Sequence, residues 1–161
     1  MAVNMSYILE IRKANISDVD AIYNITIEAF NKYVKDAGIS AKLDALEETK
    51  VDIIEDIKSK DVFIAIADGI PVGTIRVDIK ADKTALISRF GVMPQNQKNG
   101  IGRSLISFVD DYLVSKQVKK VCLYTASKHS ELICFYYKMG FYIDSTTMDK
   151  GYIRAFMVKE Y

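Results

Sequence analysis

A glycine-containing segment between two apolar runs has the residue types of an anion-binding site. Residues 97–102 read QKNGIG and join a strand-like run to a helix-like run. The first backbone N–H groups of a helix lack partners within it and carry partial positive charge, which suits a phosphate or pyrophosphate. Gly100 and Gly102 would let an anion approach the main chain without a Cβ in the way. Lys98 and Arg103 would add a screened attraction to outer phosphates.

The presence of these two glycines can also be explained without a ligand. Asn99-Gly100 could be only a turn, and Gly102 only an accommodation for packing. Other phosphate motifs fit worse, because a dinucleotide-binding fingerprint needs a third glycine where Leu105 stands. The sequence also lacks the Gly-Lys-Ser/Thr of a P-loop. An anion-binding role therefore depends on the position of the segment at the start of a helix.

Hydrophobic periodicity predicts the elements that would position this segment. Strands are expected at 7–13, at 61–80 as two strands joined around Asp68-Gly69, and at 84–92, 119–126, 141–147 and 151–161. Helices are expected at 15–30 behind a Ser17 cap, and at 43–59, 101–116 and 130–139, with 31–41 irregular. This order predicts an α/β (α+β) fold with a mostly antiparallel sheet. The strand–helix–strand unit at 84–126 should be a right-handed crossover that makes two strands parallel.

Composition limits the size of the protein and its partners. The chain has 161 residues, of which 50% are apolar, so we expect a single domain over 1–161, with 1–6 as a flexible extension. Lys and Arg total 22 against 21 Asp and Glu. A net charge this close to zero creates no overall electrostatic field that would attract nucleic acid or a membrane. The N-terminus lacks the pattern of a secretion signal, and no run reaches the ~20 apolar residues of a membrane span, so we expect the cytoplasm.

The cysteines and the histidine do not predict a metal site. Cys122 and Cys134 lie in apolar surroundings, VCLY and LICFYY, which favour buried reduced thiols over a disulfide. His129 is the only histidine and cannot build a zinc site alone. We therefore expect no metal.

Taken together, these segments resemble the GNAT-type N-acetyltransferases over nearly the whole chain. Residues 97–102 match the family's Q/R-x-x-G-x-G/A pyrophosphate loop, and 135–141, FYYKMGF, match its second signature. The opening IRKANISDVDAI (11–22) and the closing AFMVKEY (155–161) also resemble the family. The resemblance implies a twisted mixed sheet of about seven strands flanked by four helices. It also implies that the sheet splays between the fourth and fifth strands, with acyl-CoA in the V.

The resemblance also implies which residues hold the cofactor. The pantetheine arm would bond like an added strand to the main chain of Phe90, Gly91 and Val92. The pyrophosphate would be held by Gln97, Lys98, Asn99, Gly100, Ile101 and Gly102, with Arg103 and Ser104. His129 stands where relatives often have Asn, so it would cap a helix or contact CoA. Tyr33 lies in the segment that would form the wall facing the acceptor.

Tyr136 stands where the family places the tyrosine that protonates or hydrogen-bonds the leaving sulfur. An unperturbed tyrosine has a pKa of ~10 against ~8.5 for a thiol, so full proton transfer would be uphill by about 2 kcal/mol. Stabilisation of the thiolate by a hydrogen bond is thus as plausible as complete donation. The alternative is an ordinary core tyrosine, because Leu132, Phe135, Tyr136 and Met139 share helical spacing.

The sequence leaves the general base open. Deprotonating a lysine-like amine with a pKa of ~10.4 costs roughly 4.6 kcal/mol at pH 7, against about 1.4 for an α-amine near 8. Many relatives carry a carboxylate on the fourth strand, where this chain has Ser88 and Arg89. A water relay is one route. Other candidate bases are Glu28, Asp78, Tyr124 and His129.

The sequence thus predicts an acetyl-CoA-dependent N-acetyltransferase that acts on a primary amine of a small molecule or peptide. The alternative is a noncatalytic acyl-CoA-binding or sensing domain. A nucleotide-binding structural module ranks lower, and nucleic-acid binding lower still. Pairing of edge strands into a homodimer remains open.

Overall fold

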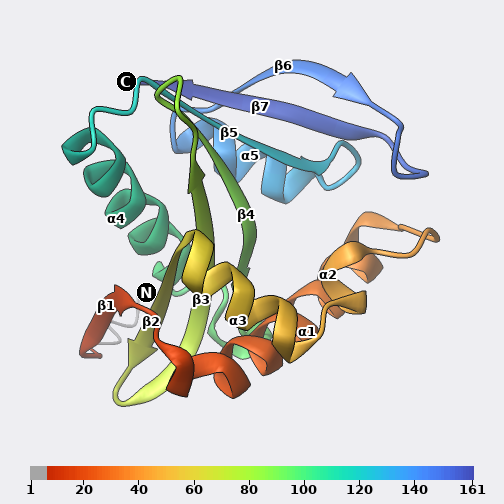
Figure 1. The fold of residues 1–161 in the computed structure, drawn as a ribbon. Helices are drawn as coiled ribbons and strands as arrows, with labels where there is room; N and C mark the ends of the chain where they lie inside the picture. Colours follow the sequence, from red (N-terminus) through yellow and green to blue (C-terminus); the bar gives the residue numbers. More distant parts are fainter. Residues whose placement is uncertain (1–6) are drawn as a thin grey trace, which may run out of the picture.

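Seven strands form one sheet in the order β1-β2-β3-β4-β5-β7-β6 in the computed structural model, which describes residues 7–161 (Figure 1). The flexible extension predicted at 1–6 lies outside the described residues. The strands are β1 (Leu9–Lys13), β2 (Asp61–Ala67), β3 (Ile70–Ile79), β4 (Thr84–Val92), β5 (Lys120–Ala126), β6 (Tyr142–Thr147) and β7 (Arg154–Glu160). The α-helices are α1 (Val19–Ala37), α2 (Asp44–Glu47), α3 (Lys50–Ser59), α4 (Ile101–Ser115) and α5 (Ser130–Lys138). Short 3-10 turns, η1 (Ile16–Asp18) and η2 (Pro94–Asn96), precede α1 and α4.

The sheet has the predicted mixed topology. β4 and β5 are parallel, and the other neighbouring strands pair antiparallel. The long crossover through α4 makes this parallel pair, as the strand–helix–strand order requires. β2 and β3 form the expected hairpin, whose turn residues Asp68 and Gly69 have φ values of 50° and 80°. The prediction of an α/β fold with a mostly antiparallel sheet of seven strands is confirmed.

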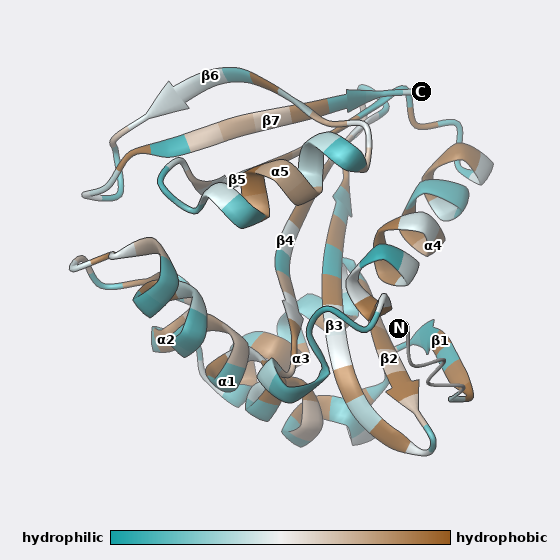
Figure 2. Cartoon of the chain, turned by 180° about the vertical axis from the view of Figure 1, so that it is seen from behind, coloured by the Kyte–Doolittle hydropathy of each residue, from teal (hydrophilic) through white to brown (hydrophobic). Residues whose placement is uncertain are grey.

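Helices cover both faces of the sheet, and the alternation along β2 assigns each side chain to a face. Phe63 and Ala65 belong to a core cluster with the α4 residues Leu105 and Val109. Val62 and Ile64 belong to a second cluster, with α1 and α3. Figure 2 shows polar and apolar residues alternating along α4, as expected for a helix with one buried face.

The first helix is longer than predicted, and it is capped differently. α1 runs to Ala37, so residues 31–37 of the segment expected to be irregular are helical, and the helix ends at Gly38, with φ 65°. Ser17 is not the cap. The side chain of Asn15 accepts the Ser17 N–H at the start of the 3-10 turn, and the carboxylate of Asp18 accepts the Asn15 N–H.

The second predicted helix is split into two, so five α-helices replace the expected four within residues 7–161. The chain is extended at Glu48, and Thr49 caps α3 in a capping box with Asp52. A Thr three residues before an acid is a helix-start signal that the helical periodicity across residues 43–59 obscured.

The expectation that both cysteines are buried is wrong. Cys134 is exposed and Cys122 is half-buried, and both are free thiols. Cys134 lies on α5, on a side away from the face that Tyr136 turns to the core, so its apolar neighbours in sequence do not bury it. None of the helices in residues 7–161 is long and apolar enough to cross a membrane.

Candidate active site

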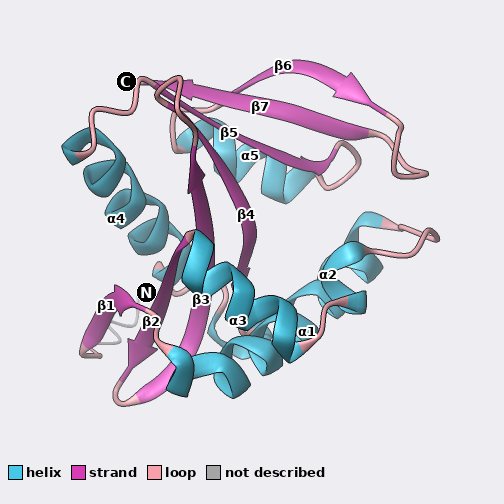
Figure 3. Cartoon of the chain, viewed as in Figure 1, coloured by secondary structure: helices cyan, strands magenta, loops and turns pink. Residues whose placement is uncertain are grey.

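The parallel pair β4–β5 separates after three rungs and opens a cleft. Thr84, Ala85 and Leu86 pair with Lys120, Val121 and Cys122, and no later pair joins the two strands. β5 instead stays paired with β7 up to Ala126 and Arg154. Figures 1 and 3 show β5, β6, β7 and α5 as one arm and α1 and α2 as part of the other, with β4 between them. The cavity between the arms has a volume of about 930 Å³, within the range of sites for large ligands.

The β4 side of the cleft carries an unpaired strand edge. Gly91 and Val92 pair with Thr74 and Gly73 of β3 on one edge, and their other edge faces the cleft. Gly91 is needed for packing, because a Cβ there would lie 3.0 Å from the Cβ of Ala29 on α1. An extended ligand could therefore add to β4 as a further strand.

One end of the cleft is formed by the start of α4. Gly100 is the N-cap residue with φ 83°, and no side chain of the described residues caps this end. The first backbone N–H groups of the helix are therefore free to bind an anion. The side chains of Lys98 and Arg103 line the cleft beside them and add positive charge. The loop is closed by Gln97, whose side-chain amide donates to the carbonyl oxygen of Val92 at 3.1 Å.

The two glycines of this loop differ in what surrounds them. A Cβ on Gly100 would meet nothing within 4 Å, so this residue leaves the approach to the main chain open. A Cβ on Gly102 would lie 3.3 Å from the Cζ atom of Phe90. The geometry at Gly102 thus fits the packing alternative, because its missing side chain makes room for the Phe90 ring. That ring in turn stacks on Phe135 at 6.1 Å.

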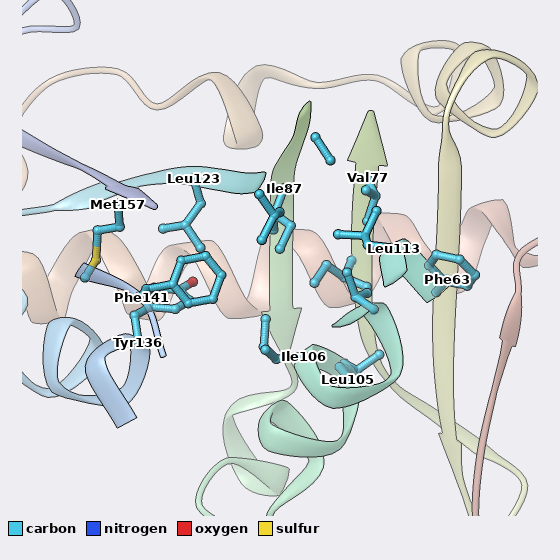
Figure 4. Close-up of a cluster of buried hydrophobic side chains, with 14 of the residues drawn as sticks. Phe63, Val77, Ile87, Leu105, Ile106, Leu113, Leu123, Tyr136, Phe141 and Met157 are labelled. Atoms are coloured by element: carbon cyan, nitrogen blue, oxygen red, sulfur yellow. The ribbon is translucent and has the colours of Figure 1, made fainter. Parts of the chain in front are cut away.

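Tyr136 lies on the α5 wall of the cleft, with only 4% of its surface exposed. Its ring makes an edge contact with Phe141 at 5.7 Å and lies 6.3 Å from that of Phe90. Figure 4 shows Tyr136 beside Phe141 at the border of the core. Burial, and secondarily the neighbouring Tyr33, raises the pKa of Tyr136 well above its usual range. The hydroxyl therefore stays protonated and can act as a hydrogen-bond donor, while a phenolate is strongly disfavoured.

His129 caps α5 and stacks on Tyr33. Its Nδ1 accepts a hydrogen bond from the Leu132 N–H at 3.3 Å, and its ring lies 5.8 Å from that of Tyr33. An accepting Nδ1 holds the proton of the neutral ring on Nε2. While the cap is formed, Nδ1 is therefore occupied and does not accept a proton from a ligand in the cleft.

The structure brings together most of the predicted site residues. Those that line the cleft are Phe90, Gly91, Val92, Gln97, Lys98, Gly100, Gly102, Arg103, His129, Tyr136 and Tyr33. Asn99, Ile101 and Ser104 are not among its lining residues. Ile101 is 1% exposed and turns its side chain into the core, so only its main chain is available to a ligand. The carbonyl oxygen of Asn99 accepts the Tyr7 hydroxyl at 2.6 Å.

Some of the candidate bases line the cleft and others do not. Tyr124 and His129 line the cleft, as does Ser88 of β4, whereas Glu28 and Asp78 are not among the lining residues. Asp78 pairs with Lys80 at the far end of β3. The geometry therefore removes Glu28 and Asp78 from direct contact with a ligand in the cleft.

Sequence reasoning missed a buried ionic network beside the cleft. Arg76 is fully buried, and its terminal nitrogens donate to Glu48 at 2.7 Å and Asp56 at 2.8 Å. Arg89, with φ 50°, lies 3.4 Å from the same Glu48 and lines the cleft. Arg76 occupies a core position of an apolar strand, and such a position gives no local signal of ionic partners distant in sequence.

A smaller acidic cavity adjoins the cleft and shares Asp44 and Arg89 with it. Its volume is about 330 Å³. It is lined by Asp44, Glu47, Glu48, Asp52, Glu55, Asp56, Lys60 and Arg89. Six carboxylates and two cations form this lining, and the buried Arg76 behind it pairs with two of the carboxylates, Glu48 and Asp56. The carboxylates still outnumber the cations, so the potential in this cavity favours positive charge.

A cleft between splayed parallel strands, with free helix amides at one end, is the arrangement that the sequence resemblance implies. The model of the acetyltransferase (GNAT) domain family matches residues 58–143, which is more than half of the chain and includes β4, the loop, α4 and Tyr136. The chain belongs to the GNAT acetyltransferase family. It is an acyl-CoA-dependent N-acetyltransferase, and its acetyl donor is acetyl-CoA.

Individual relatives of this GNAT protein agree with the family match. Over 149 residues the chain is 26% identical to a spermidine N(1)-acetyltransferase of Thermoplasma acidophilum, covering 86% of this chain and 91% of the relative. The crystal structure of the PaiA N-acetyltransferase of Thermoplasma acidophilum with coenzyme A has a TM-score of 0.84 at 24% identity. That match covers 96% of this chain and 99% of PaiA. The putative acetyltransferase YncA of Salmonella typhimurium, with acetyl-CoA, has a TM-score of 0.74 at 16% identity, covering 95% of this chain and 94% of YncA.

Residues 7–161 of the GNAT protein contain no group of three or more His, Cys, Asp or Glu side chains arranged to hold a metal ion.

Proposed function

We propose that this protein transfers the acetyl group of acetyl-CoA to a primary amine of a small molecule or peptide by direct attack. The observation that carries the proposal is the cleft where β4 and β5 separate, with the free amides of α4 at one end and Tyr136 in its wall. Acetyl-CoA supplies an activated thioester. We also propose that residues 7–161 act as one catalytic domain, because the single sheet contributes both sides of the cleft.

The chain's main-chain groups would hold the cofactor. In the proposal, Phe90, Gly91 and Val92 bind the pantetheine arm through the unpaired edge of β4. The backbone of residues 97–102, with Arg103 and Ser104, binds the pyrophosphate at the start of α4. His129 donates from Nε2 to the cofactor at the start of α5. The open space at Gly100 and the uncapped helix end support this assignment.

Tyr136 would donate a hydrogen bond to the sulfur as the thiolate leaves. Burial raises the pKa of this tyrosine, which keeps the hydroxyl protonated and makes complete proton transfer more unfavourable than in water. A hydrogen bond formed in a site that excludes water can stabilise developing charge without moving the proton. The burial of Tyr136 therefore favours stabilisation over full donation.

Deprotonation of the amine would use water and weak hydrogen-bond acceptors. Glu28 and Asp78 are away from the cleft, and His129 uses Nδ1 as a helix cap. Ser88 and Tyr124 line the cleft and could order a water that carries the proton to solvent. Such a route suits an acceptor amine of modest pKa. For a more basic amine it predicts acetylation that rises with pH.

A polyamine is the acceptor to test first. The relative from Thermoplasma acidophilum is named for spermidine. In this chain, Lys and Arg outnumber Asp and Glu in the lining of the cleft, but the cleft adjoins the acidic cavity and shares Asp44 with it. The negative potential of the acidic cavity would attract the distal positive charges of a polyamine.

The proposal is tested by incubating the protein with acetyl-CoA and a panel of spermidine, a simple monoamine and a peptide with a free α-amine. Mass spectrometry measures the acetylated amine, and a thiol reagent measures released CoA. We expect both products in equal amounts with at least one amine. Tight binding of acetyl-CoA without transfer to any amine would favour the sensing alternative.

A further inference from the structure

Tyr33 links the two arms of the cleft at a level where the sheet no longer does. Its hydroxyl oxygen accepts a hydrogen bond of 2.7 Å from the backbone N–H of Ala126, which is 93 residues away in sequence. Tyr33 lies on α1, and Ala126 is the last residue of β5. The pairing of β4 with β5 ends at Leu86 and Cys122, so this bond crosses the opened part of the V.

The ring of Tyr33 is held by its neighbours, which gives the hydroxyl a defined position. Phe30 makes an edge contact with it at 5.7 Å, and His129 stacks on it at 5.8 Å with an interplanar angle of 21°. His129 is itself fixed by its cap on Leu132. The contacts of Tyr33 therefore connect α1 with the junction of β5 and α5. This junction belongs to the wall that also carries Tyr136.

The bond to Ala126 uses only part of what the hydroxyl can do. A tyrosine hydroxyl can donate one hydrogen bond and accept others, and the Ala126 N–H occupies one accepting position. Tyr136 and Tyr152 line the same cleft. Burial, and secondarily the neighbouring Tyr33, raises the pKa of Tyr152 to about 12. Tyr33 thus lies near the hydroxyl groups of two other tyrosines that line the cleft.

We propose that Tyr33 is a positioning residue, a strut that fixes the width of the cleft between the α1 wall and the β5–α5 arm. This inference rests on the proposed function. Attack of an amine on a thioester requires the reacting atoms to approach within ~3–3.5 Å, and a misplacement of ~1 Å can lower the rate about 10²-fold. Without the strut, the acceptor wall can move away from the bound thioester, while the cofactor contacts at β4 and α4 remain.

The test is Tyr33→Phe, which keeps the ring contacts with Phe30 and His129 and removes only the hydroxyl. The matched control is Tyr23→Phe, on the same helix but outside the cleft lining. We expect Tyr33→Phe to lower kcat for amine acetylation at least ~10-fold. The Kd for CoA should change less than ~2-fold, because its main proposed contacts lie on β4 and at the start of α4.

Amide hydrogen exchange at Ala126, followed by NMR, tests the bond itself. We expect slow exchange in the wild type and in Tyr23→Phe, and faster exchange in Tyr33→Phe. Equal exchange in all three proteins would overturn the strut. Acetylation by Tyr33→Phe at the rate of the control would also overturn it, as would equal losses of CoA binding and acetyl transfer, which indicate general damage.

The inference and the proposed function fail separately. If the wild type transfers acetyl groups to no amine, the proposed function fails, and exchange at Ala126 still decides whether the strut exists. If the wild type acetylates an amine and Tyr33→Phe matches Tyr23→Phe, only the strut is wrong.

Discussion

The side-chain amide of Gln97 donates a hydrogen bond to the carbonyl oxygen of Val92, 3.1 Å away, and so joins the end of β4 to the loop that begins α4. The bond connects the two proposed parts of the CoA site. Gln97→Ala should loosen the loop and weaken CoA binding by ~3- to 10-fold, in line with the loss of one hydrogen bond. Calorimetric titration with CoA measures this, and Gln95→Ala, exposed in η2, is the control. Equal affinities would contradict the link.

The uncapped start of α4 predicts a difference between two similar glycines. Gly100 and Gly38 both have positive φ, 83° and 65°, and a Cβ at either would meet nothing within 4 Å. Gly100→Ala and Gly38→Ala should each lower the free energy of unfolding by about 1 kcal/mol, because alanine resists this conformation. Only Gly100→Ala should also weaken CoA binding, since its methyl group lies at the proposed approach to the amides. If both variants bind CoA alike, Gly100 serves only the turn.

Tyr136→Phe tests the proposed donor to the leaving sulfur. The variant keeps the ring among Phe90, Phe135 and Phe141 and removes the hydroxyl. We expect kcat to fall by ~10- to 100-fold at saturating acceptor, with the Kd of acetyl-CoA nearly unchanged. The raised pKa of Tyr136 predicts that this ratio of kcat values stays constant from pH 6 to about 9, below any ionisation of the phenol. A core role alone would leave turnover unchanged where chemistry limits the rate.

Asp44 tests whether the acceptor carries more than one positive charge. Its carboxylate lies 3.2 Å from Lys150 at the border of the cleft and the acidic cavity. Asp44→Asn should raise the KM for spermidine by ~3- to 10-fold and leave the KM for a monoamine unchanged. The matched control is Asp20→Asn, which breaks a similar exposed pair with Lys50 at 3.0 Å, outside the cleft lining. The same KM change for both amines would argue against recognition of a distal cation.

Asp18 predicts a pH dependence of stability. Its carboxylate accepts two hydrogen bonds from Arg12, at 2.8 and 2.9 Å, and one from the Asn15 N–H at 2.8 Å. The bond from Arg12 is the main cause that lowers the pKa of Asp18 below 3.8 in the folded state. The ionised form therefore stabilises the fold above that pH, and the contribution is lost as the pH falls through the lowered pKa.

Asp18→Asn should accordingly lower the free energy of unfolding by about 1–3 kcal/mol at pH 7. Denaturant titrations at several pH values should show this difference shrinking below about pH 4. Asp111→Asn, an exposed position on α4, serves as the control and should show no comparable change. A difference that stays constant down to pH 2 would mean that ionisation of Asp18 is not its source.

The errors of the sequence prediction have local causes. The 84–92 strand and the hairpin at Asp68-Gly69 agree with the structure because alternation and turn residues act within a few positions. The predicted end of the first helix at residue 30 is too early because Gly38, rather than a change in polarity, stops the helix. The prediction of a buried Cys134 is wrong because apolar neighbours in sequence do not reveal which face of α5 is covered.

The sequence by itself determined the class of fold, the glycine loop before α4 and the signature that contains Tyr136, because each depends on residues close together in the chain. Only the tertiary structure decided which groups meet across the cleft. Tyr33 and Ala126, or Arg76 and Glu48, come together because β4 and β5 separate and the helices pack on the sheet. Such contacts follow from the packing of whole helices and strands, and the local residue pattern of a single sequence does not reveal them.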